Sequence, residues 1–244
     1  IILGHYVPAN QGDQQDGQMV LDLLAYHPGT ARSVCRKLCR RLVADDPPQT
    51  LVDAAAAVFM AAWAAPDQIK QVVQTIVLSP EFAASWGQKI KRPFEATMGA
   101  LRASAAEFTP SGAFEWYFQQ AGQALFSRRS PDGYPDRRAN WSNTTSLLQR
   151  WRLVNYMAQG NIDDATLDFQ GQMPPSIQTP NAIADFWIDR LLGRPMDPPS
   201  NRDQVVSFMA QGRGPDLNLP ADQIADRLPH MAALILMSPD FQWR

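Results

Sequence analysis

Apolar residues recur along the chain with helical spacing. From Ala31 to Leu42 they fall at positions i, i+3, i+4, i+7, i+8 and i+11, which form one face of an amphipathic helix. Further stripes of this kind run through residues 51–60, 69–77, 94–105 and 224–235. No stretch sustains the alternation of apolar and polar residues that is typical of a half-buried strand. The pattern therefore predicts an all-α protein.

Prolines separate the helical stretches instead of interrupting them. Pro48 and Pro93 each stand where a helix can begin, because the missing N–H of a first-turn proline has no partner inside the helix. In the phrase SPEF at 79–82, Ser79 can cap a new short helix that has Pro80 at its first position. We interpret this phrase as a structural corner between two helices.

The corner phrase occurs twice, and its surroundings repeat with it. SPEF at 79–82 and SPDF at 238–241 each close an apolar run. Each is preceded upstream by an aspartate and two prolines, at 46–48 and at 197–199. A repeat in fixed order indicates an internal duplication of a helical unit.

The repeats divide the chain into three parts. We expect a single all-α domain over residues 1–244 that also contains one long ordered loop. Repeat unit one is expected at about 28–87, central helices and the loop at about 93–160, and repeat unit two at about 180–244.

Composition restricts the class of protein. The chain has 244 residues, of which 45% are hydrophobic and 19% charged, as in ordinary globular proteins. The formal net charge of −2 argues against a general nucleic-acid binder. No apolar run reaches the roughly 18 residues that a membrane span needs. The first residue is Ile1, and we expect the chain to be the C-terminal part of a longer protein.

Two cysteines and three histidines are the residues with the strongest affinity for metals. Cys35 and Cys39 lie four apart on the apolar stripe, so we interpret them as core residues, with a metal or disulfide role as the alternative. The histidines lack the spacing of a metal motif, and His27 precedes a helix start where an imidazole commonly bonds a backbone group. We predict no metal site and no cofactor.

Basic side chains gather on the polar side of the helix at 31–42, among them Lys37 and Arg40. The plainer interpretation is a solvated face with local ion pairs to the aspartates that follow. The alternative is an anion site, to which Lys91 would contribute from a neighbouring helix. An acidic polysaccharide would suit such a site.

The segment at about 127–145 breaks the helical pattern and is rich in Pro, Gly, Asp, Asn and Arg. Long loops inside compact domains are usually functional or disordered, so this loop is the best candidate for a site. Tyr134 and Trp141 can either stack on sugar rings or pin the loop onto the helices. Asp132 and Asp136, together with Glu95, are the carboxylates that a hydrolase or lyase would use.

Several motifs in order resemble the bacterial domain of unknown function 1800 family. They include AYHPGTARSVCRKLCRRL, IVLSPEF, KIKRPFEATMGALRA and the loop that contains GYPD and ends at a tryptophan. Family positions fall here on Lys37, Lys91, Glu95, Trp141 and Arg150. The resemblance covers essentially the whole chain. It implies an exported bacterial protein, periplasmic or extracellular, because members are often encoded beside a second, secreted family.

We therefore expect a non-enzymatic binding or assembly module. Its partner would be an envelope or extracellular glycan, or another chain such as the N-terminal remainder of the same protein. The alternative is a polysaccharide-acting hydrolase or lyase with Glu95, Asp132 and Asp136 as candidate carboxylates. The sequence leaves open whether the protein is an enzyme. The ligand-binding candidates are Lys37, Arg40, Lys91, Tyr134, Trp141 and Arg150.

Overall fold

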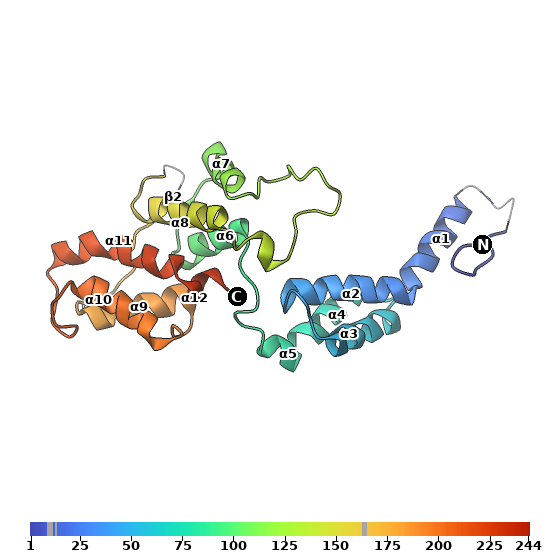
Figure 1. Cartoon of the computed structure of the whole chain (residues 1–244), viewed down its shortest axis with the longest axis horizontal. Coiled ribbons are helices and arrows are strands. Elements are labelled where there is room, and N and C mark those ends of the chain that lie inside the picture. Colours follow the sequence, from blue (N-terminus) through green and yellow to red (C-terminus); the bar gives the residue numbers. More distant parts are fainter. Residues whose placement is uncertain (9–11, 13, 163–164) are drawn as a thin grey trace. The chain divides into compact units, whose positions relative to one another are not determined.

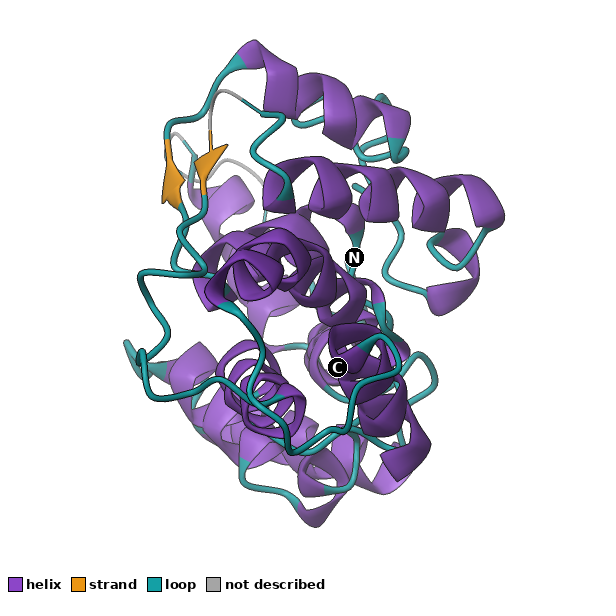
Figure 2. Cartoon of the chain, turned by 90° about the vertical axis from the view of Figure 1, so that its left-hand side faces the viewer, coloured by secondary structure: helices purple, strands orange, loops and turns teal. Residues whose placement is uncertain are grey.

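A computed structural model describes residues 1–8, 12, 14–162 and 165–244, and most of them are helical (Figures 1 and 2). The chain divides into two compact units, unit 1 at Ile1–Gln88 and unit 2 at Lys89–Arg244. The prediction of an all-α protein is confirmed, since the described residues contain only one two-stranded ribbon besides isolated β-bridges. Within these residues, no helix combines the length and apolar character that a membrane crossing requires.

Unit 1 is built from helices that share one apolar core. The helices are α1 (Gln15–Tyr26), α2 (Pro28–Leu42), α3 (Gln49–Ala61), α4 (Gln68–Val77) and the one-turn α5 (Pro80–Ala83). The predicted stripe on α2 is confirmed, because Ala31, Cys35 and Cys39 are fully buried and the other apolar positions pack against the same core. Figure 1 shows α2, α3 and α4 packed side by side.

The two predicted helix caps in unit 1 are confirmed. Nδ1 of His27 accepts a hydrogen bond of 3.0 Å from the Gly29 amide at the start of α2. Oγ of Ser79 accepts one of 3.1 Å from the Phe82 amide at the start of α5. Each bond satisfies a backbone donor that has no partner inside its own helix. His27 therefore has a structural role.

Unit 2 contains a longer series of helices. Its elements are α6 (Pro93–Ala103), β1 (Glu107–Phe108), α7 (Gly112–Gln120), the 3₁₀ helix η1 (Arg138–Asn140), α8 (Thr144–Ala158), β2 (Ala165–Thr166), α9 (Pro180–Leu192), α10 (Pro199–Ala210), α11 (Ala221–Met237) and the one-turn α12 (Pro239–Gln242). Helix α11 packs against α8, α9 and α10, and the fully buried Trp187 lies in this core. The antiparallel ribbon of β1 and β2 is drawn in orange in Figure 2.

Details of the predicted stripes differ from the structure. Helix α6 ends at Ala103, so Ala105 lies outside it with a left-handed φ of 49°. Ile69 on α4 is 47% exposed. The predicted loop at 127–145 ends earlier than expected, because Oδ1 of Asn143 caps α8 by accepting a 2.8 Å hydrogen bond from the Ser146 amide.

Helices of the two predicted repeat units follow one order. The series α2–α5 and α9–α12 each contain three helices and a one-turn helix that begins at the proline of an SP pair. The third helix is longer in the second series, with 17 residues in α11 and 10 in α4. This order is what a duplication would produce. The duplication itself and the single domain over 1–244 stay predictions.

Candidate functional site

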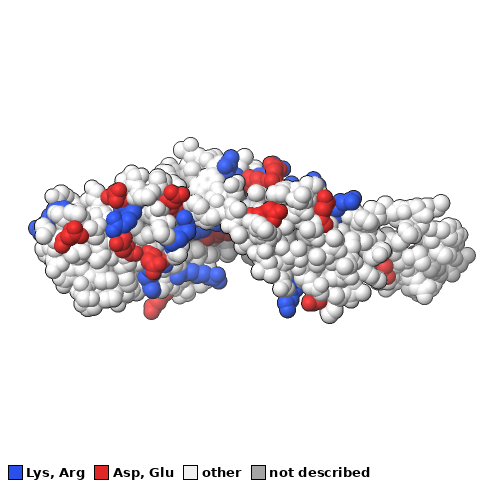
Figure 3. Space-filling model, turned by 90° about the horizontal axis from the view of Figure 1, so that it is seen from below, with Lys and Arg blue, Asp and Glu red and all other residues white. Residues whose placement is uncertain are grey.

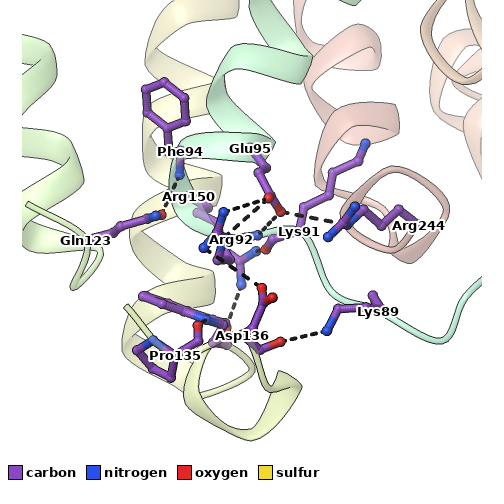
Figure 4. Close-up of polar contacts among 11 residues, drawn as sticks. Lys89, Lys91, Arg92, Phe94, Glu95, Gln123, Pro135, Asp136, Arg150 and Arg244 are labelled. Atoms are coloured by element: carbon purple, nitrogen blue, oxygen red, sulfur yellow. Dashed lines mark hydrogen bonds and ion pairs between the residues drawn. The ribbon is translucent and has the colours of Figure 1, made fainter. Parts of the chain in front are cut away.

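The start of α6 is the centre of a polar cluster in unit 2 (Figure 4). Glu95 accepts a 3.0 Å hydrogen bond from the Arg92 backbone amide and a 3.1 Å bond from the Arg92 guanidinium. Nε of Arg244 lies 3.8 Å from the Glu95 carboxylate, and Asp136 lies 3.9 Å from the Arg92 guanidinium. Two of the three candidate catalytic carboxylates are therefore held in ion pairs with the same arginine.

Arg150 is buried, with 2% of its surface exposed, and binds three backbone carbonyls. Its Nη1 donates to the Lys91 carbonyl at 2.5 Å and its Nη2 to the Trp141 carbonyl at 2.7 Å. Its Nε donates to the Ser146 carbonyl at 3.3 Å. Burial lowers the pKa of Arg150 to about 10. The side chain therefore positions the loop against α8 and the segment before α6.

Lys91 is a half-buried residue whose amine lies beside an aromatic ring. Its Nζ lies 3.5 Å from the centroid of the Phe241 ring, within the range of a cation–π interaction. Burial, followed by the charges of Arg194 and Arg244, lowers the pKa of Lys91 to about 8, against an opposing effect of Glu95. The protonated amine is therefore less favoured here than in water.

The segment 89–91 pairs with the C-terminal segment 242–244. The Lys89 amide donates to the Arg244 carbonyl at 3.2 Å, and the Arg244 amide donates to the Lys89 carbonyl at 2.8 Å. The buried Lys89 also donates from Nζ to the Asp136 carbonyl at 2.7 Å. These bonds tie the loop, the start of unit 2 and its last residues together.

The loop between α7 and α8 borders a pocket of about 210 Å³, called the loop pocket below. Tyr134 and Trp141 line it, with ring centroids 6.0 Å apart. Nε1 of Trp141 donates to the Pro135 carbonyl at 2.8 Å, and the Tyr134 hydroxyl donates to the Ala124 carbonyl at 2.6 Å. Both hydrogen bonds join residues within the loop itself, and the two aromatic side chains also form part of the pocket wall.

Most of the remaining wall of the loop pocket is polar and uncharged. The only charged residue in its described lining is Arg128, which lies 3.6 Å from Asp132 and 5.8 Å from the Tyr134 ring centroid. Asp132, the third candidate carboxylate, has a side chain that is 70% exposed. The amide and hydroxyl side chains of the wall are Gln120, Asn140, Asn143, Thr145 and Ser146.

Ser146 combines burial with an unsatisfied hydroxyl. It is 3% exposed, and its Oγ has no hydrogen-bond partner among the described residues. Buried hydroxyl groups in proteins are usually hydrogen-bonded, and an unpaired one costs free energy. This hydroxyl is enclosed by protein atoms, so the amide and hydroxyl groups open to a ligand in the loop pocket are those of the other wall residues.

The basic face of α2 belongs to unit 1, whereas Lys91 and Arg150 belong to unit 2. Lys37 is exposed, and Nε of Arg40 donates to the Asp45 carbonyl at 3.0 Å. This arrangement matches a solvated face with local hydrogen bonds. The anion site that would combine Lys91 with Lys37 and Arg40 stays a prediction.

The thiols and carboxylates of the chain do not gather into a metal site within the described ranges, since no group of three or more suitable side chains lies there. Cys35 and Cys39 are free and buried, which confirms their interpretation as core residues. Burial raises the pKa of each thiol to about 11, and it does so more strongly than any neighbouring charge.

Sequence reasoning missed the pairing of Arg92 with Glu95 and the roles of Arg244 and Asp240. Arg92 precedes Glu95 by three residues at a helix start, and this spacing was a usable signal. Asp240 is buried and accepts hydrogen bonds of 2.8 Å from the Asp197 amide and 2.9 Å from the Asn201 side chain. No local pattern indicates these partners, because they lie about forty residues away in the chain.

Fold and loop pocket together define an all-α protein whose ordered loop forms a polar pocket on a helical scaffold. The chain belongs to the family described as proteins of unknown function DUF1800, whose family model matches residues 1–243. The resemblance noted in the sequence is thereby confirmed. No curated protein and no solved structure matches the chain.

Proposed function

We propose that unit 2 is a non-enzymatic binding module for an envelope or extracellular glycan, with the loop pocket as its site. The observation that carries this proposal is the composition of the pocket wall. It combines an aromatic ring, Tyr134, with five amide or hydroxyl side chains, and its described lining includes no Asp or Glu. Aromatic faces suit sugar rings, and a few polar groups fix the orientation of a ligand.

The state of the carboxylates favours binding over hydrolysis. A hydrolase or lyase of the expected kind would need two carboxyl groups that face a common substrate. Glu95 and Asp136 instead interact with Arg92, and Asp132 lies on the exposed side of the loop beside Arg128. The alternative of a polysaccharide-acting enzyme therefore has less support.

The distribution of charge on one face of the molecule argues against a nucleic-acid ligand. On the face shown in Figure 3, acidic and basic side chains are interspersed instead of forming a patch of one sign. A nucleic-acid binder would usually present a continuous basic surface. We place the protein in the periplasm or outside the cell, as the family resemblance implies.

For unit 1 we propose an assembly role with a partner chain. Helix α1 buries none of its residues, and Leu21, Leu24 and Tyr26 are 61%, 42% and 51% exposed. Exposed apolar surface of this kind is typical of protein–protein contacts. Replacing Leu21 and Leu24 with serine should abolish binding to the natural partner in a cross-linking experiment and leave the helical circular dichroism signal intact. Undiminished cross-linking would contradict the role.

Glycan binding is tested by NMR titration of the full chain with neutral trisaccharides (chitotriose, cellotriose and maltotriose) and with an acidic trisaccharide, trigalacturonate. We expect a neutral sugar to shift the signals of Asn140 and Thr145 saturably. Asn140→Ala should weaken binding about tenfold, through the loss of a ligand hydrogen bond. Gln159→Ala, an exposed amide on another part of the surface, is the control and should have no effect.

Two results would overturn the glycan proposal. One is the absence of shifts around the loop pocket with every neutral sugar of the series. The other is equal weakening by Asn140→Ala and Gln159→Ala, which would show that the effect does not depend on the pocket.

A further inference from the structure

A second pocket in unit 2 lies where α8, α10 and α11 meet the corner formed by SPDF. Its volume is about 300 Å³, at the lower end of the range for small-molecule sites. Trp151 from α8 and Leu234 and Met237 from α11 supply apolar wall, as do Met196 and Val205. We call it the corner pocket.

Polar groups in the corner pocket are few and uncharged. They belong to Asn201, Gln204 and Ser238, and its described lining contains no Asp, Glu, Lys or Arg. Oγ of Ser238 already donates to the Ile235 carbonyl at 2.7 Å. A charged ligand would lose its hydration here without gaining a counter-charge, which is unfavourable. The lining therefore selects for an uncharged molecule.

Hydrogen bonds to Asp240 and Asp197 hold the side chain of Asn201 in place. Its Nδ2 donates to the Asp240 carboxylate at 2.9 Å and to the Asp197 carbonyl at 3.3 Å. No described residue donates a hydrogen bond to its side-chain oxygen. The buried Asp240 also accepts a bond from the Asp197 amide at 2.8 Å, so the amide group of Asn201 is fixed before any ligand arrives. Because the side-chain nitrogen of Asn201 is already hydrogen-bonded, its side-chain oxygen is the atom that can accept a hydrogen bond from a ligand. A ligand with a hydrogen-bond donor would match it.

Trp151 gives the pocket an exposed aromatic side. Trp151 lies on α8 and is 40% exposed. Because tryptophan has a large apolar side chain, this exposure leaves apolar surface in contact with water. A ligand in the corner pocket would cover part of this indole and remove apolar area from water.

We propose that the corner pocket binds a small, uncharged, mainly apolar molecule that carries one hydrogen-bond donor, of the aliphatic or aromatic alcohol class. The apolar walls take the hydrocarbon part, and the side-chain oxygen of Asn201 accepts the donor. The corner pocket differs from the loop pocket in its lining residues and in the chemistry of its ligand. The proposal for the corner pocket is therefore independent of the glycan proposal for the loop pocket.

The test is an NMR titration of the full chain carrying ¹³C-methyl methionine. The probes are hexan-1-ol, the ether 1-methoxypentane, which has the same size without a donor, and hexanoate, which carries a charge. We expect hexan-1-ol to shift the methyl signals of Met196 and Met237 saturably, while Met98 on α6, which lines neither pocket of unit 2 described above, serves as the internal reference. The ether should bind about fivefold more weakly, for the loss of one hydrogen bond, and hexanoate more weakly still.

Two tryptophan variants provide the matched comparison. Trp151→Ala should weaken hexan-1-ol binding about tenfold, whereas Trp116→Ala, which removes an exposed tryptophan from α7, should leave it unchanged. If Trp151→Ala fails to fold, Leu234→Ala replaces it. The proposal is overturned if hexan-1-ol shifts neither Met196 nor Met237, if it shifts Met98 equally, or if hexanoate binds as tightly as the alcohol. Equal weakening by the two tryptophan variants would also overturn it.

Discussion

The guanidinium of Arg150 donates a 2.5 Å hydrogen bond to the carbonyl oxygen of Lys91, 59 residues earlier in the chain. The same side chain binds the carbonyls of Trp141 and Ser146, so one buried cation connects α8, the loop and the start of α6. The wall of the loop pocket depends on this connection, because Trp141 and Ser146 both belong to it.

Replacing Arg150 with methionine should lower the free energy of unfolding by roughly 3 kcal/mol, because three carbonyls lose their donor in a buried place. Arg152→Met is the control, since Arg152 is exposed on the same helix and its loss should cost less than about 0.5 kcal/mol. Urea denaturation of both variants measures the difference. Equal losses in the two variants would contradict the positioning role of Arg150.

Lys91 should make stability depend on alkaline pH. Its pKa is about 8 in the folded chain and is ordinarily 10.5, so the unfolded chain binds more protons between these values. The free energy of unfolding therefore gains a contribution that rises from pH 8 towards pH 10.5. Lys91→Met lacks this contribution, and urea denaturation from pH 7 to pH 10 should show the wild type gaining stability relative to it. A constant difference across this range would refute the burial effect.

Cys35 and Cys39 should resist thiol reagents in the folded protein. Burial raises the pKa of both thiols to about 11, and the thiolate is the reactive form. At pH 8 we expect Ellman's reagent to react with both residues at least about a hundredfold more slowly than in 8 M urea. Rapid reaction of the folded chain would show that α2 leaves the core easily.

The two SP corners should respond differently to loss of the serine. Ser79 accepts a hydrogen bond from the Phe82 amide, whereas Ser238 makes no side-chain cap to its short helix. Ser79→Ala should therefore speed hydrogen exchange of the Phe82 amide about fivefold, equivalent to a cap worth roughly 1 kcal/mol. Ser238→Ala should leave the exchange of the Phe241 amide nearly unchanged, and a comparable acceleration there would contradict the assigned difference.

Local patterns predicted the helices well because they record which face of each helix is apolar. The apolar stripe through Cys35 and Cys39 predicted both the helix and its buried side. The cap at Ser79 was predicted from the three residues that follow it. The ribbon of β1 and β2 could not be predicted in this way, since its strands are short and distant in the chain.

Site residues were harder to predict because their roles depend on distant partners. Glu81 and Asp240 occupy the same place in the repeated phrase, yet Asp240 is buried by partners from the α9–α10 connection and α10. Tyr134 and Trp141 lie near each other in the loop, and their role in ligand binding stays a prediction. The i,i+3 pair of Arg92 and Glu95 was predictable from spacing, whereas only the folded chain brings Arg92 to Asp136 and Arg244 to Glu95.

The mutual hydrogen bonds of Lys89 and Arg244 place the two ends of unit 2 side by side. A short linker could join these two ends, and new termini could be introduced in a surface connection such as the one before α11. Domains with adjacent ends tolerate circular permutation and transplantation into a host loop. Unit 2 is thus suited to be carried as an insert by another protein without rearranging its helices.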